Sequence, residues 1–393
     1  MSPWISERPA GEVAAELARS RGALAGVRLA LDVGLDSGLD GGLVGGPVAA
    51  LCGAGAVVVG TTIRGGCPNA IGCGAADLAV GADCNDSDTG YGGVAITPTV
   101  GTMGSVGVVA DSEDRLTLFA HELALANRAM GIVAAAAPGP WPADTRLAAS
   151  PEPLLAVPGD WPAVDGHRAA FDAALAALAD AGARFVEVDM TEVADEVAAA
   201  VQGSDALVAP AVSALAVPFG LCAVRVGEVR VVARAYDDAV ALDVAACSSG
   251  VYPSVDVWPV AAADVAELVV FGAHLHGGPL AHQLTDLGAR WAGELTTAPH
   301  YRMTVLPTVP AKPAVTRVPH GTSGAGLTGH RWLLSPAALG RFLMALPAPM
   351  QLGKVEFDDG TWRTAFGCDA AAATGADISG YGSWPAAMAA GAI

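Results

Sequence analysis

The segment from residue 154 to residue 190 constrains the fold more than any other part of the chain. LLAVPG (154–159) is typical of a buried strand, GHRAAFDAALAALADAGA (166–183) has the period of a helix, and RFVEVDM (184–190) is again strand-like. A strand, a helix and a strand in this order form a crossover unit whose two strands run parallel. The sequence therefore predicts an α/β protein, with further buried strands expected at 26–35, 56–60 and 205–210.

The composition of the chain restricts its partners and its compartment. With 393 residues the chain is long enough for two domains. Its net charge of −19 opposes binding to nucleic acid and to anionic membranes, so we expect a small-molecule substrate. We find neither an uninterrupted apolar run that could span a membrane nor a signal peptide in residues 1–22. The seven scattered cysteines are an odd number, which is typical of the reducing cytoplasm.

The order of local patterns predicts where the domains begin and end. Residues 111–131 open with polar residues suited to an N-cap and continue with a helical apolar period, so we predict one helix there. Residues 247–264 carry two prolines and no clear period, which predicts a linker. The predicted domains are therefore residues 1–246 and 265–393. Near the end of the second domain, Asp359 and Gly360 predict the turn of a hairpin.

Histidines gather in the second predicted domain. Six of the eight histidines lie between His274 and His330, and three of them fall in the glycine-rich stretch FGAHLHGGPLAHQL (271–284). A histidine suits proton transfer near neutral pH, and exposed backbone N–H groups of a glycine-rich loop suit a carboxylate. A zinc site is the alternative, but the H-x-H-x5-H spacing is not that of a usual zinc site, so we predict no metal. The spacing of Cys67, Cys73 and Cys84 also lacks a fourth ligand, which favours small buried apolar side chains.

The blocks AVVVGTT, CGAADLAVGAD, VAITPTVG and GVVADSEDRLTLFAHELALANRAMG resemble, in this order, the amidase-signature family. That resemblance implies a mixed sheet flanked by helices, and amide hydrolysis by a triad of serine, cis-serine and lysine. Thr61 occupies the position of the family's lysine, and Arg64 or a neighbour that of the cis-serine. Counting forward from AVGAD puts Ser87 at the position of the nucleophile, whereas counting back from VAITPT does not. Because a serine without its base is a poor nucleophile, we interpret Ser87 as a loop residue, with a live nucleophile as the alternative.

The second half of the chain is similar to the C-terminal domain of allophanate hydrolases. The similarity is carried by VVFGAHLHGGPLAHQLTDLGARWAGELTTAPHYRMTVLP and by LPAPMQLGKVEFDDGTW. It keeps its order over nearly the whole chain, is strong after residue 265, and is eroded before residue 105. The resemblance implies a truncated amidase-signature fold followed by a small α+β barrel of the γ-glutamylcyclotransferase type. It also implies a homodimer, and loss of CO2 as the step that the C-terminal domain promotes.

The resemblance and the chemistry of the loop together assign candidate roles. We predict His274 as the main acid and base, although a histidine that merely packs in the core is the alternative. His330 stands where the related folds carry an acidic residue, so we predict it as a second catalytic group beside His274, with Glu294 as the nearest alternative carboxylate. His276 and His282 fall at variable positions. The predicted substrate-binding residues are Gly272, Leu275, Gly277 and Gly278 around the anion, Gln283 and Tyr301 for orientation, and Arg302 for a carboxylate.

These inferences converge on one functional hypothesis. The chain is predicted to be an allophanate hydrolase-like enzyme that lacks the amidase triad. It acts through its C-terminal domain on a small N-carboxy or carbamoyl-type compound by decarboxylation, without a cofactor, in a specialised pathway. A cyclotransferase-like enzyme that removes an acyl group, and a non-catalytic partner of a live hydrolase, are the alternatives.

Overall fold

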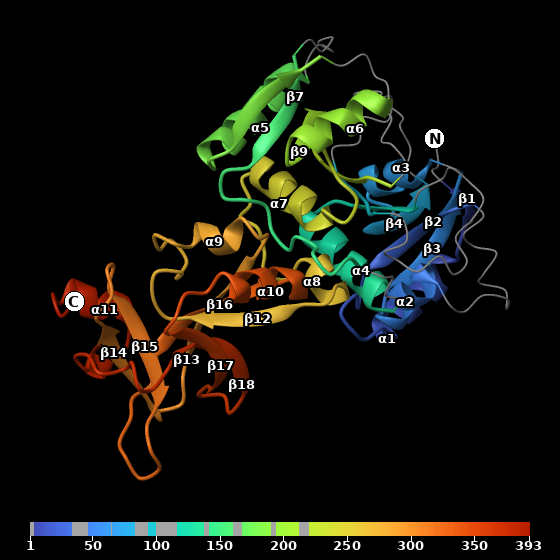
Figure 1. Cartoon of the computed structure of the whole chain (residues 1–393). Helices are drawn as coiled ribbons and strands as arrows, with labels where there is room; N and C mark the ends of the chain where they lie inside the picture. Colours follow the sequence, from blue (N-terminus) through green and yellow to red (C-terminus); the bar gives the residue numbers. More distant parts are fainter. Residues whose placement is uncertain are drawn as a thin grey trace. The chain divides into compact units, whose positions relative to one another are not determined.

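The structure is a computed structural model that describes residues 4–33, 46–63, 65–82, 93–99, 116–136, 141–159, 167–189, 194–211 and 220–393. The chain divides into two compact units, of which the first is coloured blue to yellow and most of the second yellow-orange to red in Figure 1. The first comprises residues 1–142 and 151–263, and the second residues 143–150 and 264–393. The segment expected as a linker carries helix α8 (Trp258–Ala262) and belongs to the first unit up to Ala263. None of the helices in the described ranges is long and apolar enough to cross a membrane.

A single mixed sheet organises the described part of the first unit. Its strand order is β1-β3-β2-β4-β6-β5-β10-β11-β9-β7-β8. β2 pairs in parallel with β3 and β4, and β7 pairs in parallel with β8 and β9, whereas the other pairings are antiparallel. This mixed sheet with its helices confirms the predicted α/β class. The strands are β1 Trp4–Glu7, β2 Arg28–Asp32, β3 Val57–Thr62, β4 Leu78–Ala82, β5 Val94–Thr97, β6 Leu116–Ala120, β7 Leu154–Pro158, β8 Arg184–Val188, β9 Ala206–Pro210, β10 Cys222–Val226 and β11 Val229–Ala233.

The predicted crossover unit is present. Helix α5 (Arg168–Asp180) connects β7 to β8, which run parallel in the register Leu154 to Arg184. The helix buries Phe171, Ala174 and Leu178, which are spaced three and four residues apart and therefore lie on one face. The other helices of this unit are α1 Ala10–Arg19, α2 Pro47–Gly53, α3 Cys67–Gly72, α4 Leu123–Ala136, α6 Ala194–Gly203 and α7 Asp238–Ser248.

The prediction of one helix over residues 111–131 is wrong. Residues 116–120 form strand β6, which pairs with β4 on one side and β5 on the other, and helix α4 begins only at Leu123. Thr117 is fully buried and shares a hydrogen bond of 2.9 Å with Thr97 of β5. Two neighbouring strands thus outweigh the helical period of a five-residue stretch, because pairing partners distant in sequence decide strand formation.

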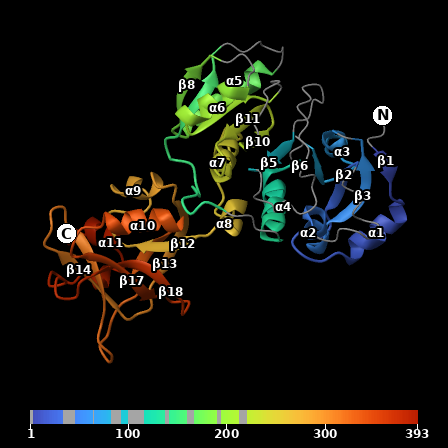
Figure 2. The same ribbon diagram turned by 45° about the vertical axis from the view of Figure 1, so that its right-hand side comes forward.

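The second unit has a five-stranded sheet in the order β13-β16-β12-β18-β17 and a two-stranded ribbon, β14-β15 (Figure 2). Residues 143–150 belong to this unit because the Leu147 N–H donates to the Gly288 carbonyl (2.8 Å) and the Leu147 carbonyl accepts from Arg290 Nε (2.6 Å). Its elements are β12 Ala266–Val270, α9 His282–Thr285, β13 Arg290–Thr296, β14 Tyr301–Leu306, β15 Lys312–Arg317, β16 Thr328–Leu334, α10 Pro336–Met344, β17 Met350–Glu356, β18 Trp362–Cys368, η2 Ser379–Tyr381 and α11 Trp384–Ala389.

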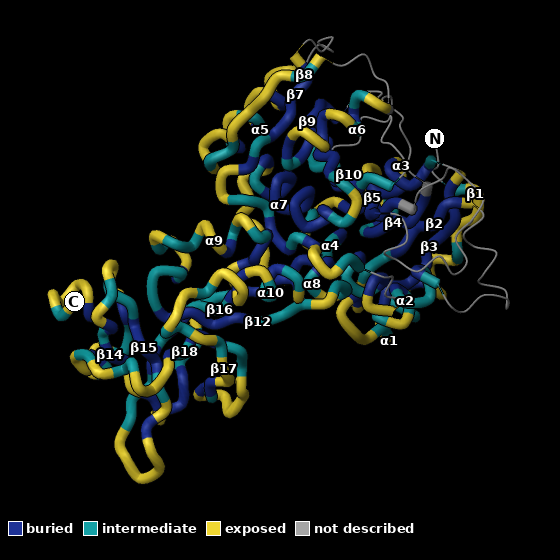
Figure 3. The backbone as a smooth tube through the Cα atoms, viewed as in Figure 1, coloured by how far each residue is buried: buried dark blue, intermediate teal, exposed yellow. Residues whose placement is uncertain are grey.

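Strand β12 lies at the centre of the second core and delivers the candidate loop. Leu268, Val269, Val270 and Phe271 are buried, and Figure 3 shows this second half of the strand in dark blue. Helix α10 covers this sheet and begins where the Ser335 side chain accepts the N–H of Ala338, with Pro336 as its first residue. The predicted hairpin between β17 and β18 is present, and Gly360 supplies its positive φ of 78°.

Candidate functional site

The glycine-rich loop after β12 is held mainly by its own backbone. The N–H of Gly278 donates to the Leu275 carbonyl (2.7 Å), and the N–H of Leu280 donates to the Ala273 carbonyl (2.9 Å). A Cβ at Gly278 would lie 2.6 Å from the Ala273 oxygen, which leaves no space for a side chain. A Cβ at Gly272 would similarly lie 2.6 Å from the ring of Pro313 on β15. Both glycines are therefore required by close packing.

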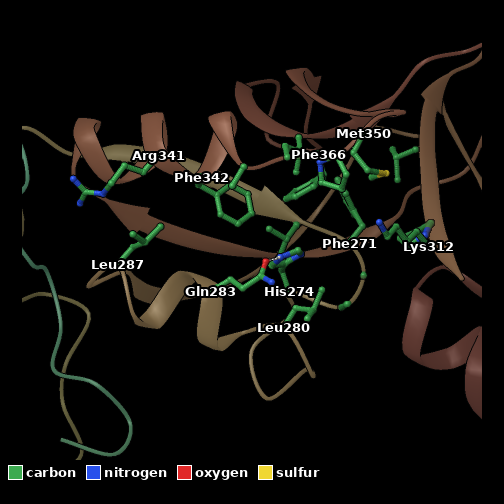
Figure 4. A pocket seen from close by; sticks show the side chains of 18 of the residues that line it. Phe271, His274, Leu280, Gln283, Leu287, Lys312, Arg341, Phe342, Met350 and Phe366 are labelled. Carbon is green, nitrogen blue, oxygen red and sulfur yellow. Dashed lines mark hydrogen bonds between the residues drawn. The ribbon is translucent and has the colours of Figure 1, made fainter. Parts of the chain in front are cut away.

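A pocket of about 560 Å³ opens beside this loop (Figure 4). Side chains from the loop and α9 form one wall, and the end of α10, β15 and β18 supply the others. A pocket of this size is within the range of small-molecule sites in proteins. Its lining consists of Val270, Phe271, Gly272, Ala273, His274, Leu280, Gln283, Asp286, Leu287, Lys312, Pro313, Val315, Arg341, Phe342, Ala345, Leu346, Pro347, Met350 and Phe366.

His274 occupies a defined position in this pocket. Its ring stacks on Phe366 with centroids 5.3 Å apart and meets Phe342 edge-on at 5.2 Å. Its Nε2 lies 2.9 Å from Oε1 of Gln283, drawn as the dashed line in Figure 4. Its backbone carbonyl accepts a hydrogen bond of 3.2 Å from Trp332 Nε1. Because an amide oxygen can only accept, the neutral imidazole carries its proton on Nε2 and keeps a lone pair on Nδ1.

The surroundings of His274 favour its neutral form. Burial lowers the pKa of the imidazole below its usual value, and the electrostatic interactions with His282 and Lys312 lower it further. The hydrogen bond to Gln283 opposes them in part. The lowered pKa favours the neutral imidazole, and an anion bound nearby would stabilise the protonated ring.

The pocket also contains two cationic side chains that the sequence patterns did not single out. Lys312, at the start of β15, and Arg341, on α10, lie at opposite ends of the pocket in Figure 4, with His274 between them. The chain has only two lysines, Lys312 and Lys354, and one of the two lines this pocket. This rarity was the one sequence signal for Lys312. Phe342 and Phe366 gave none, since they read as ordinary core residues of a helix and a strand.

The structure brings together three of the predicted site residues, Gly272, His274 and Gln283. The others lie elsewhere in the second unit. Leu275 is buried in the core, and Gly277 and Gly278 are in the loop but do not line the pocket. The hydroxyl of buried Tyr301 accepts from the Glu356 N–H (2.7 Å) and from Arg317 (3.1 Å), and exposed Arg302 faces Asp377 at 3.9 Å.

His330 belongs to a different cluster from His274. Its Nδ1 accepts the N–H of His276 (2.8 Å), and its Nε2 faces Glu294 at 3.3 Å. Burial lowers the pKa of His330, while Glu294 opposes this shift and His276 adds to it. The His276 ring stacks on Trp291 at 4.4 Å. His330 is not part of the pocket lining, so the expected pair with His274 is replaced by a pair with Glu294.

Some candidate residues from the first half of the chain lie among the described residues, and others do not. Ser87, Arg64 and Cys84 lie outside the described residues. Thr61 is buried on β3, and Cys67 is buried as predicted, but Cys73 is exposed at the end of α3 and is not a core residue. Within the described ranges, no three histidine, cysteine or acidic residues are arranged to hold a metal ion.

Comparison with known proteins identifies the second unit. Residues 266–389 match the family model described as "Allophanate hydrolase C-terminal domain". The match spans most of the second unit. Over 108 residues, 27% of its length, this chain is 34% identical to the urea amidolyase of Lachancea kluyveri. Over 125 residues it is 30% identical to the urea amidolyase of Saccharomyces cerevisiae. These matches span only 6% and 7% of the two relatives.

The allophanate hydrolase resemblance also holds for the fold of the whole chain. The solved structure of Kluyveromyces lactis allophanate hydrolase is similar over 99% of this chain and 93% of that chain, with a TM-score of 0.72. The sequence identity is 19%, so this comparison establishes a shared fold. The predicted resemblance to allophanate hydrolases is therefore confirmed, in sequence for the second unit and in fold for the chain.

Proposed function

We propose that the allophanate hydrolase C-terminal domain of this chain decarboxylates a small N-carboxylated compound, X–NH–COO⁻. The observation that carries the proposal is the pocket in which His274, on a wall of aromatic rings, is accompanied by Lys312. An ammonium group attracts the substrate carboxylate, and a histidine can deliver a proton to the nitrogen. The names of the similar proteins, urea amidolyase and allophanate hydrolase, refer to compounds with this kind of carbon–nitrogen bond.

The reaction balances with these groups alone. Binding of the carboxylate beside Lys312 raises the pKa of His274, which then takes a proton from solvent. The imidazolium transfers this proton to the substrate nitrogen as the C–N bond breaks, and the electron pair of that bond stays on nitrogen. The products are X–NH2 and neutral CO2. Apolar walls such as Phe342 and Phe366 favour this step, because the carboxylate charge disappears as CO2 forms.

We further propose that the first unit does not hydrolyse amides through the triad of the amidase-signature family. Both lysines of the chain, Lys312 and Lys354, belong to the second unit. Thr61, at the position that resembles the family's lysine, is buried on strand β3 and has a hydroxyl that cannot act as a base at neutral pH. The proposed chemistry of the chain therefore rests on the second unit.

The test is the rate of CO2 release from the carbamate of a primary amine. The carbamate is formed at alkaline pH and mixed with the protein at neutral pH, and proton uptake is followed with an indicator dye. We expect the protein to accelerate CO2 release, and His274→Ala to remove about 10²- to 10⁴-fold of that acceleration, the usual contribution of a general acid. His320→Ala is the matched control, since His320 is exposed in the same unit and does not line the pocket. Equal rates for His274→Ala and the wild type would refute the proposed role.

A further inference from the structure

We infer that the group X on the substrate nitrogen is apolar and sizeable, an alkyl or aryl group, so that the substrate is the N-carboxylated form of an apolar amine. This inference rests on the proposed function of the same pocket, and it names the class of substrate. Such a substrate differs from a urea-derived dicarboxylate, in which X is a second carboxylate. Three features of the pocket carry it: its volume, the chemistry of its walls and the placement of its charges.

The volume exceeds what a urea-derived compound needs. At about 30 Å³ for each water molecule in the liquid, the 560 Å³ of the pocket correspond to about 19 waters. A dicarboxylate of six or seven non-hydrogen atoms displaces about four waters at the same density. Such a compound leaves most of the pocket filled with solvent, and a substrate with a larger X removes that solvent from the apolar walls.

The walls beyond His274 are apolar. Phe342 and Phe366 enclose the imidazole, and Leu280, Leu287 and Met350 continue the surface on either side of it (Figure 4). The ring centroids of Phe342 and Phe366 are 5.6 Å apart in an edge-to-face arrangement, which forms a firm apolar surface. A carboxylate held against this surface loses hydration without gaining a partner, whereas an alkyl or aryl group gains free energy by burial.

The charges select an anion at one end only. Lys312 lies on the side of Met350 and Phe271, and it is close enough to His274 to lower the pKa of the imidazole. At the other end, exposed Arg341 lies near Leu287 in Figure 4, and Asp286, which precedes Leu287 in the chain, adds a carboxylate to the pocket lining that offsets the positive charge. A substrate that places its carboxylate beside Lys312 and its nitrogen at His274 therefore extends X along Phe342 towards Leu287.

The experiment measures the affinity of stable analogues in which CH2 replaces the NH group, X–CH2–COO⁻. Acetate and malonate represent small and dicarboxylate substrates, and hexanoate and 3-phenylpropanoate represent apolar ones. Each methylene group that the pocket buries strengthens binding about fourfold. Hexanoate, with four more methylenes than acetate, is expected to bind up to roughly two-hundredfold more tightly, as measured by calorimetry.

Two variants locate the two ends of the ligand, and a third serves as their control. Lys312→Gln is expected to weaken all four carboxylates. Leu287→Ala is expected to weaken hexanoate and 3-phenylpropanoate several-fold and to leave acetate unchanged, because it shortens the apolar wall only. Leu343→Ala is the matched control, since Leu343 is half exposed on α10 and does not line the pocket. Circular dichroism and the melting temperature of each variant verify that it folds.

The outcomes separate this inference from the proposed function. Tight binding of the apolar acids that depends on both Lys312 and Leu287 supports the inference. If malonate binds in a Lys312-dependent way and hexanoate binds no more tightly than acetate, the inference is overturned and the proposed function stands. If the carbamate of benzylamine alone loses CO2 no faster with the protein than without it, the inference fails. If the apolar acids bind equally well to Lys312→Gln, or if the protein accelerates CO2 release from neither methylamine carbamate nor benzylamine carbamate, the proposed function fails, and the inference fails with it.

Discussion

Asp238 couples the stability of the first unit to pH. It lies on α7, is 2% exposed, and accepts two hydrogen bonds from Thr99, one from the N–H (2.8 Å) and one from the hydroxyl (2.7 Å). The Thr99 hydroxyl in turn accepts the N–H of Tyr236, at 2.8 Å. Burial raises the pKa of Asp238 from 3.8 to about 6, although the hydrogen bonds from Thr99 act in the opposite direction. Removing its charge by Asp238→Asn tests this balance.

The size and sign of the effect follow from that shift. When the pKa of a carboxyl group is higher in the folded than in the unfolded state, the free energy of unfolding falls as pH rises. The fall takes place between the pKa of the unfolded state and that of the folded state. A shift of about 2 units corresponds to about 3 kcal/mol, reached above pH 6 and absent well below pH 4. The amide that Asp238→Asn introduces can keep both contacts, because the Thr99 hydroxyl can accept from the amide N–H. Relative to the wild type, the variant therefore gains about 2 kcal/mol between pH 4 and pH 7.

Thermal unfolding of the whole chain at several pH values measures this gain. In a unit of this size, 1 kcal/mol shifts the melting temperature by about 2–4 °C, so the difference between variant and wild type changes by about 4–8 °C from pH 4 to pH 7. Asp180→Asn removes an exposed charge from the end of α5 and serves as the control for net charge. A difference between Asp238→Asn and the wild type that stays constant over this pH range contradicts the reasoning.

Three further predictions concern the second unit. The value of kcat/KM for decarboxylation is expected to fall as pH rises through the lowered pKa of His274. The corresponding fall in kcat lies at higher pH, because a bound carboxylate raises that pKa. If the pH–rate profile of His274→Ala is the same as that of the wild type, this assignment is excluded. Gln283→Leu removes the hydrogen bond that raises the pKa of His274, so the fall in kcat/KM shifts to lower pH, with stability measured in parallel. Gly278→Ala forces a Cβ to within 2.6 Å of the Ala273 oxygen and is expected to destabilise the unit by at least about 1 kcal/mol. Gly340→Ala, in open space on helix α10, is expected to stabilise the unit by up to about 1 kcal/mol. Denaturant unfolding measures both changes.

Local patterns predicted those elements whose stability depends on neighbours in sequence. The crossover β7-α5-β8 and the hairpin at Gly360 followed from apolar periodicity and turn chemistry. Strand β6 was missed because its two partners, β4 and β5, lie elsewhere in the chain and provide the pairing that overrides its helical period.

The candidate site shows the same limit. His274 and Gln283 could be predicted because they lie in one short motif, in which the loop and α9 bring their side chains within hydrogen-bond distance. Lys312 reaches the same pocket only because β15 packs beside the loop, where Pro313 touches Gly272, and no spacing in the sequence encodes that approach. His330 was placed beside His274 by its strand position, but its side chain turns to Glu294 and to the N–H of His276.

The hydrogen bonds of the loop change the explanation of its glycines. The sequence suggested that free N–H groups of a glycine-rich loop bind the substrate carboxylate. In the structure four of these donors are engaged within the protein: the N–H groups of Leu275, His276, Gly278 and Leu280 donate to Gly272, His330, Leu275 and Ala273. The glycines at 272 and 278 permit close packing instead. We therefore expect the Lys312 ammonium to contribute most to carboxylate recognition in this pocket, so that Lys312→Gln weakens carboxylate binding.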